Sequence, residues 1–409
     1  MGEKKEKEEA AGKPNDNDKP KPSSPAPPSP TPMQEEEHVG LSGPELVPGA
    51  PEEAREQIIT IGNVAVPPGT TSHLKVKISE SYTSQAVHIP ISVINGAHYG
   101  PTVFISAALH GDELNGVETV RRLIYEVDLA QLHGALVLVP VVNVLGFESA
   151  SRYLPDRRDL NRVFPGHPSG TAAERIADKI FNIALKCQYA IDIHTAAVGR
   201  MNMPHVRADM SISTCRRLAK AFGTEIIMDE AGVKHSFRYN LTTNKVPCIL
   251  LEAGQSNRFE PNMVAAGLQG VLNVLYELGM LKGEKKEPLF RVIVKTTEWV
   301  RVNQGGLLDL KVKPRALVNE GDPLAIVENP FGKEQETVRA PFTGMVVGIV
   351  TNPLVFPGGP VCHLVKIDKA LDKVKAALSG IDTTKKPAPA EQPKPAEPII
   401  GTSAKASPV

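Results

Sequence analysis

The sequence predicts an α/β protein whose mixed sheet carries helices on both faces, followed by a small all-β, barrel-like module. Near-continuous apolar runs at 102–109, 135–143 and 247–252 are typical of strands buried on both faces. A segment of helical periodicity at 113–127 separates the first two runs, and strands alternating with helices indicate an α/β sheet. From about Pro288, short apolar runs with Gly and Pro turns every 8 to 12 residues predict the all-β module.

In chain order, alternating or continuous apolar patterns predict strands at 57–61, 73–78, 87–94, 102–109, 135–143, 189–193, 225–228 and 247–252. Helical periodicity predicts helices at 113–127, 172–186, 213–222 and 262–281. The module is expected to contain strands at 290–295, 322–327, 344–350 and 361–367, followed by a helix at 369–379. The stretch 146–170, rich in Gly, Pro, Arg and Asp, is expected to be a loop.

These patterns divide the chain into a large α/β domain at 55–286, the β module at 287–369 and a short helix at 370–382. The flanking stretches 1–54 and 383–409 are rich in Pro, Lys, Glu and Ser. Such composition buries too little apolar surface to offset the entropy of ordering, so both are expected to be disordered tails. Partner-binding polyproline segments are the alternative for these tails.

Composition excludes several functions for the 409-residue chain. Lys+Arg and Asp+Glu both total 46, so no net basic field attracts nucleic acid or an anionic membrane. No apolar run approaches the ~20 residues of a membrane span, and the N-terminus lacks the apolar segment of a signal peptide. The four cysteines are scattered and are expected to be buried free thiols in a reducing compartment. The expected location is the cytoplasm.

Three residues at predicted carboxyl strand ends have the chemistry of zinc ligands. His110 and Glu113 follow the strand at 102–109, and His194 directly follows the strand at 189–193. The carboxyl ends of strands in an open α/β sheet are where ligands bind. A catalytic zinc keeps three protein ligands and leaves its fourth position open. One such residue alone is better explained as structural, but the set predicts a site for one zinc ion per chain.

Glu252 is the candidate general base of such a site. It ends the apolar strand at 247–252 and is followed by the small residues Ala253 and Gly254. An unpaired carboxylate at the end of a buried strand is costly, which favours a functional role over a structural one. The alternative is a structural pair between Glu252 and a nearby Arg.

The loop 152–166 is dense in arginine and could bind substrate. It contains Arg152, Arg157, Arg158 and the pair Asn161-Arg162. A solvated basic loop is the ordinary explanation of such clustering. Arg, however, is suited to bidentate carboxylate binding, so one Arg could hold a substrate carboxylate while another polarises the scissile carbonyl.

Four motifs together resemble the succinylglutamate desuccinylase/aspartoacylase family, which is related to the zinc carboxypeptidases. They are His110-Gly111-Asp112-Glu113, the loop Arg158 to Arg162 ending in Phe164-Pro165-Gly166, Asp192-Ile193-His194-Thr195, and Leu251-Glu252-Ala253-Gly254. The resemblance spans roughly residues 56–368. It implies a zinc carboxypeptidase-like fold and metal-dependent hydrolysis of the amide bond of an N-acyl amino acid or related small carboxylate.

The resemblance also assigns roles to individual residues. It implies His110, Glu113 and His194 as zinc ligands and Glu252 as the base that acts on a metal-activated water. Asn161 and Arg162 look like the carboxylate clamp, with Arg158 counted among the substrate-binding residues. Arg152 is the best match to the Arg that polarises the carbonyl, with Arg157 and Arg158 as competitors.

Two other functions stay open at this level. One is a metallocarboxypeptidase acting on peptides or peptidoglycan fragments, and the other is a non-catalytic binding protein of the same fold. The sequence leaves the oligomeric state open, a homo-oligomer included. In the β module, 319–323 and 340–344 look like pieces of biotinyl or lipoyl barrels, but the turn at 328–333 lacks the residues that flank a modified Lys. The module is therefore expected to be structural or to cover the site.

Overall fold

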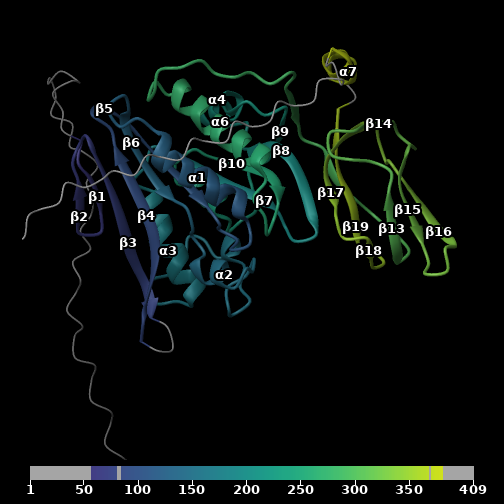
Figure 1. The fold of residues 1–409 in the computed structure, drawn as a ribbon, viewed down its shortest axis with the longest axis horizontal. Coiled ribbons are helices and arrows are strands. Elements are labelled where there is room, and N and C mark those ends of the chain that lie inside the picture. Colours follow the sequence, from purple (N-terminus) through teal and green to yellow (C-terminus); the bar gives the residue numbers. More distant parts are fainter. Residues whose placement is uncertain (1–56, 81–83, 368–369, 381–409) are drawn as a thin grey trace, which may run out of the picture. The chain divides into compact units, whose positions relative to one another are not determined.

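A thirteen-stranded mixed sheet forms the centre of the protein (Figure 1). The computed structural model describes residues 57–80, 84–367 and 370–380, so the tails predicted at 1–54 and 383–409 lie outside the described residues. The main path of the sheet runs β12-β19-β17-β8-β10-β7-β5-β6-β4-β3, with β9, β11 and β14 paired beside it. These strands are β3 (Thr70–Glu80), β4 (Ala86–Asn95), β5 (His98–Ala107), β6 (His133–Val139), β7 (Tyr189–Ala196), β8 (Arg200–Ala208), β9 (Ile226–Asp229), β10 (Cys248–Gln255), β11 (Val292–Val294), β12 (Thr297–Arg301), β14 (Leu317–Val318), β17 (Gly344–Val350) and β19 (Pro360–Lys366). A separate hairpin pairs β1 (Ile59–Ile61) with β2 (Val64–Val66).

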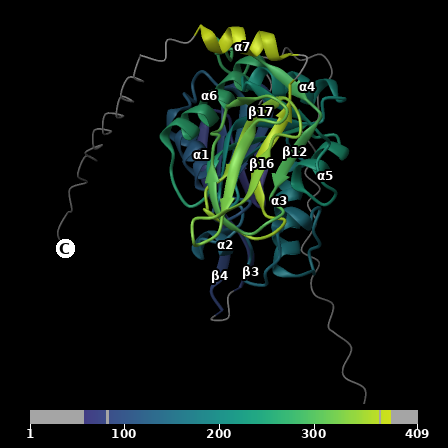
Figure 2. The same cartoon turned by 90° about the vertical axis from the view of Figure 1, so that its right-hand side faces the viewer.

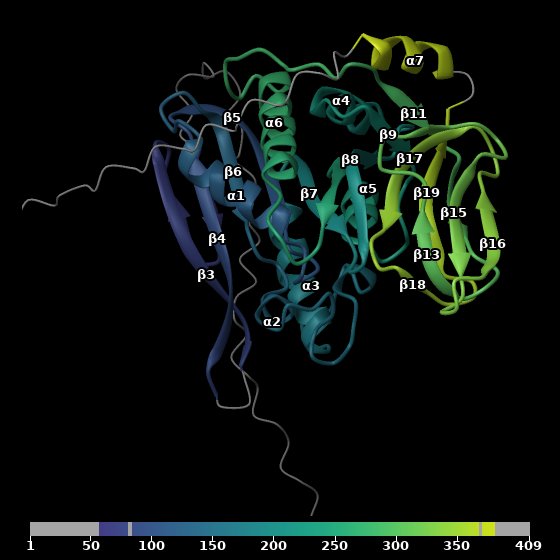
Figure 3. The same cartoon turned by 45° about the vertical axis from the view of Figure 1, so that its right-hand side comes forward.

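Helices cover both faces of this sheet, as the sequence predicts (Figure 3). Strand β5 shows why: Phe104 points into the apolar core beneath α3 and α5, while Val103 and Ile105 point into the core beneath α1, α4 and α6. Side chains alternate across a strand, so a run that is apolar at every position needs a covering layer on each side. The helices are α1 (Leu114–Glu126), α2 (Val144–Glu148), α3 (Ala172–Ala184), α4 (Ser213–Phe222), α5 (Phe237–Thr243), α6 (Pro261–Glu277) and α7 (Leu371–Ser379), with a 3-10 turn at Leu160–Arg162.

The parallel strands β6, β5, β7 and β10 bring the predicted site residues to one edge. β10 pairs with β7 in parallel, and Glu252 lies directly opposite His194 in that register. β7 in turn pairs with β5, whose carboxyl end leads to His110. Parallel strands end at the same edge of a sheet, so residues distant in sequence meet there.

Two elements close to the site are not predicted by the sequence patterns, namely β8 and α5. β8 pairs antiparallel with β10 and β17 and adds to the mixed character of the sheet, as do the antiparallel pairs of β4 with β3 and β6. The sequence of β8 mixes polar and apolar side chains and contains Pro204, a residue that is rare inside strands. His205 of β8 is fully buried and lies opposite Glu252.

The C-terminal strands are divided between two sheets (Figure 1; Figure 2 looks onto this end of the protein). Strands β12, β14, β17 and β19 extend the large sheet, and a separate four-stranded sheet runs β16-β15-β13-β18. The latter contains β13 (Gly306–Leu310), β15 (Pro323–Glu328), β16 (Glu334–Arg339) and β18 (Leu354–Val355). An apolar core with contributions from both sheets, including Val300, Val327 and Leu364, holds the layers together. The pairing of β17 with β8 joins this region directly to the strand beside Glu252.

All four cysteines are buried and free, as predicted. Among the described residues, no helix has both the length and the apolar character that crossing a membrane requires.

Candidate metal centre and active site

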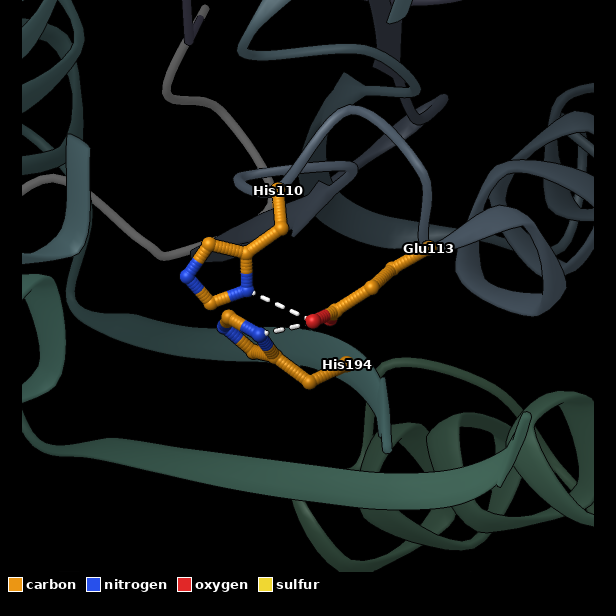
Figure 4. Close-up of side chains that lie close together, drawn as sticks. All are labelled: His110, Glu113 and His194. Carbon is orange, nitrogen blue, oxygen red and sulfur yellow. Dashed lines mark hydrogen bonds and ion pairs between the residues drawn. The ribbon is translucent and has the colours of Figure 1, made fainter. Parts of the chain in front are cut away.

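His110, Glu113 and His194 converge at the carboxyl edge of the sheet (Figure 4). One ligand atom from each residue lies within 4.8 Å of the other two, and all three residues are buried. His110 stands in the turn after β5, Glu113 is the residue before the first turn of α1, and His194 lies in β7. The turn is tight at Gly111, where a Cβ atom would lie 2.0 Å from the carbonyl carbon of Gly146. Only glycine fits that position, which explains the Gly within the motif.

The hydrogen bonds of the two imidazoles suit a metal site. The Nε2 of His110 lies 3.3 Å from Asp159 Oδ1, and the Nε2 of His194 lies 2.7 Å from Asp192 Oδ2. A carboxylate on one ring nitrogen orients a histidine whose other nitrogen binds a metal. The two Nδ1 atoms point at Glu113, at 2.6 Å and 2.9 Å from its two carboxylate oxygens. If each Nε2 carries the ring proton, both Nδ1 lone pairs face Glu113, an arrangement that a cation between them would stabilise.

The net charge of this cluster also favours a bound cation. Glu113, Asp159 and Asp192 are three carboxylates around two imidazoles, and Arg152 is the one guanidinium bonded to them, so neutral imidazoles leave a formal charge of −2. Burial alone would lower the histidine pKa values, but the carboxylates outweigh it and raise the pKa of both His110 and His194. The site therefore attracts positive charge, and a divalent cation would balance it in place of protons. The donor set of two imidazoles and one carboxylate fits zinc.

Glu252 lies beside this cluster, opposite His194 in the pairing of β10 with β7. Its Oε2 accepts a hydrogen bond of 3.0 Å from Asn202 Nδ2, and its Oε1 lies 3.6 Å from Arg207 Nε. Burial raises the pKa of this carboxyl, although Arg207 and His194 lower it in part. The Arg207 contact is too long for a hydrogen bond, so Glu252 is held mainly by Asn202 and stays available for a ligand.

A cavity of about 550 Å³ opens over these residues. Arg152, Asn161 and Arg162 of the 152–166 loop line it. Arg152 bonds Asp159 at 2.9 Å and lies 3.1 Å from His110 Nδ1, which places its guanidinium next to the metal-binding group. Asn161 accepts a hydrogen bond of 2.8 Å from the backbone N–H of Phe237 at the start of α5. This bond fixes the loop against α5 and turns the adjacent Arg162 toward the cavity.

The other two arginines of the loop stand elsewhere. Arg158 has a half-exposed side chain that pairs with Asp156 at 3.3 Å, and it is not among the residues that line the cavity. Arg157 is also exposed and outside that lining. The structure thus brings Arg152, Asn161 and Arg162 to the cavity over His110, Glu113 and His194 and leaves Arg158 outside.

The cavity also contains residues that the sequence did not single out. Arg207 and Arg238 lie 3.3 Å and 3.0 Å from Oε1 of the same carboxylate, Glu230. Arg200 from β8 and Trp299 from β12 also line the cavity. Arg200, Asn202 and Arg207 all belong to β8, which carries them along the cavity. Recognising that strand would have been the signal for all three.

Fold and site together define an α/β protein with a His-Glu-His group at the carboxyl edge of its sheet that could hold a metal ion. Residues 99–278 match the succinylglutamate desuccinylase/aspartoacylase catalytic domain. The chain is 28% identical over 269 residues to N-alpha-acetyl-L-2,4-diaminobutyric acid deacetylase of Halomonas elongata, covering 62% of this chain and 78% of the relative. It is 26% identical over 283 residues to a succinylglutamate desuccinylase of Paraburkholderia xenovorans, covering 64% and 78%.

Among solved structures, the chain resembles the product-bound ectoine utilization protein EutE (DoeB) of Ruegeria pomeroyi. The TM-score is 0.66 at 27% identity, and the match covers 73% of this chain and 95% of that one. Residues 99–278 therefore match the catalytic domain of the succinylglutamate desuccinylase/aspartoacylase family, which supports the resemblance inferred from the four motifs.

Proposed function

We propose that this protein is a zinc-dependent deacylase that hydrolyses the amide bond of an N-acyl amino acid or a related small carboxylate. The observation that carries this proposal is the convergence of the His110 and His194 Nδ1 atoms on Glu113, with Glu252 beside them in the same cavity. The relatives named as a deacetylase and a desuccinylase support an acyl amino acid as the substrate.

Three residues would hold the zinc: His110 and His194 through Nδ1, and Glu113 through its carboxylate. Asp159 and Asp192 would keep both imidazoles oriented through their Nε2 atoms. A zinc ion bound there supplies a Lewis acid that polarises the amide carbonyl and makes water more acidic.

Glu252 performs the proton transfers in this proposal. Its carboxylate accepts a proton from the attacking water and then donates it to the amine that leaves. A carboxyl whose pKa is raised by burial is a better base than an ordinary glutamate near neutral pH, since catalysis is best when the pKa lies near the working pH. Asn202 holds one oxygen of Glu252 and so fixes the direction from which the proton is taken.

Arginines supply the remaining interactions. Arg152, next to the metal-binding group, is placed to stabilise negative charge that develops on the carbonyl oxygen. Arg162 and Asn161 are proposed to bind the substrate carboxylate, and Arg162 carries no carboxylate partner among the described residues that would compete. Arg158 does not enter the proposal.

The test combines metal analysis with a panel of N-acyl amino acids and short peptides. We expect about one zinc per chain in the wild type and hydrolysis of at least one N-acyl amino acid. Glu252→Gln should retain zinc and lose turnover by orders of magnitude, whereas Glu298→Gln, an exposed residue of β12, should leave both unchanged. Cleavage of peptides alone would select a carboxypeptidase. Zinc-free protein or normal turnover in Glu252→Gln would refute the mechanism.

A further inference from the structure

The arginines of the cavity fall into two groups by their partners. Arg152 pairs with Asp159, and Arg207 and Arg238 share Glu230. Arg162 and Arg200 line the same cavity, and within the described ranges neither has an ion pair with a carboxylate. Arg162 is already proposed as the clamp for the substrate carboxylate. Arg200 is left as a second guanidinium without a charge partner.

Arg200 is nevertheless held in place. It is the first residue of β8, and its Cζ atom lies 4.6 Å from the centre of the Trp299 ring. Trp299 is itself stacked on His363, with ring centres 5.0 Å apart and planes 9° apart, and the two residues face each other across β12 and β19. A guanidinium that lies flat on an indole makes this contact with its face. Its N–H groups point outward in its own plane and remain free to donate hydrogen bonds.

In the part of the chain that the structure describes, no carboxylate forms an ion pair with Arg200. Burial lowers the pKa of its guanidinium, and the nearby cations Arg301 and Arg152 lower it further. His363 adds no charge, since burial lowers its pKa to about 3 and leaves the imidazole neutral. A half-buried, protonated guanidinium without a partner is costly, and an anion bound in the cavity would offset that cost.

We propose that Arg200, held on Trp299, binds a second negatively charged group of the substrate and so selects substrates with two carboxylates over those with one. One carboxylate would lie at Asn161 and Arg162, and the other at Arg200. The second carboxylate could belong to the acyl group or to the amino acid, and the same guanidinium would bind either. This assignment rests on the deacylase proposed above and names its substrate class.

Two matched substrate pairs distinguish the two sources of the second charge. N-acetyl-L-aspartate and N-acetyl-L-asparagine differ in charge on the amino acid, whereas N-succinyl-L-alanine and N-succinamoyl-L-alanine differ in charge on the acyl group. In the wild type we expect kcat/KM to favour the diacid at least tenfold in one of the pairs. Arg200→Gln should reduce that ratio by about 10- to 100-fold, mainly through KM, because it removes a charge-assisted hydrogen bond.

Arg301→Gln is the matched control. This exposed arginine lies on β12 and bonds the backbone carbonyl oxygen of Gly358, so its loss removes a nearby charge without opening the cavity. It should leave the ratio within about twofold. A wild type without preference in either pair, or an unchanged ratio in Arg200→Gln, would overturn the assignment.

A second readout does not depend on turnover. Trp299 is the only tryptophan of the chain, so tryptophan fluorescence reports on the ring that holds Arg200. Titration of the diacid of each pair into Glu252→Gln should change this emission, and the combined variant with Arg200→Gln should bind at least tenfold more weakly. If no substrate is hydrolysed but this difference is observed, the deacylase proposal fails and the anion site stands. Equal binding in both variants would refute the anion site even in an active enzyme.

Discussion

The contact between Asn202 and Glu252 makes a sharp prediction about the pH dependence of activity. Asn202→Ala removes the donor that stabilises the charged carboxylate at 3.0 Å. Burial already raises the pKa of Glu252, and this hydrogen bond partly lowers it, so its loss raises the pKa further. A hydrogen bond to a charged group contributes about 1.5–3 kcal/mol, so activity on the acidic limb of the pH profile should fall about tenfold or more in this variant.

The assay is the pH profile of kcat/KM on a hydrolysed N-acyl amino acid. Glu252 must be deprotonated to accept a proton, so activity rises with pH through its pKa. In Asn202→Ala the acidic limb should move to higher pH, and activity should recover in part at pH values above the shifted limb. Asn352→Ala, an exposed position in the turn after β17, should leave the limb in place. A uniform loss of activity with an unmoved limb would refute the role of Asn202.

Three further variants test the metal-binding group and its turn. His110→Ala should lose the metal, as should chelation of the wild type, and unchanged zinc content by mass spectrometry would remove His110 from the ligand set. Asp192→Ala should weaken zinc binding about 10- to 100-fold in a chelator competition, since His194 loses its orienting carboxylate; an unaltered affinity would contradict that role. Gly111→Ala forces a Cβ against the Gly146 backbone and should destabilise the fold by about 3 kcal/mol in thermal unfolding. Gly380→Ala, where φ is −76° and an added Cβ would meet nothing closer than 3.8 Å, should change stability much less, and equal losses in the two variants would contradict the steric argument.

The site residues follow from the sequence to different extents. His110, Glu113, His194 and Glu252 could be named because each ends or follows an apolar strand, and carboxyl strand ends of a parallel sheet meet at one edge. Arg152 could not be separated from Arg157 and Arg158 by sequence, because all three share one loop. Their separation depends on how Asn161 binds the backbone of α5, which fixes that loop in space.

The chemistry contributed by β8 could not be predicted at all. Its polar and apolar residues do not show the regular alternation of a half-exposed strand, because β8 pairs with β10, β17 and β9 and also contributes residues to the cavity. The sequence around Asn202, His205 and Arg207 therefore shows no strand pattern. Once β8 pairs with β10, the same residues surround Glu252.

The sequence by itself determined the α/β architecture, the strands whose carboxyl ends carry the site, and the four residues proposed for the metal and the base. These features can be predicted from local patterns, because apolar periodicity and the ends of strands are determined by short stretches of sequence. Only the tertiary structure decided which arginines reach the cavity and which of them keep an unpaired charge. Charge pairing is a property of neighbours in space: Glu230 pairs with both Arg207 and Arg238 only in the folded chain, and Arg200 meets Trp299 across nearly a hundred residues of chain.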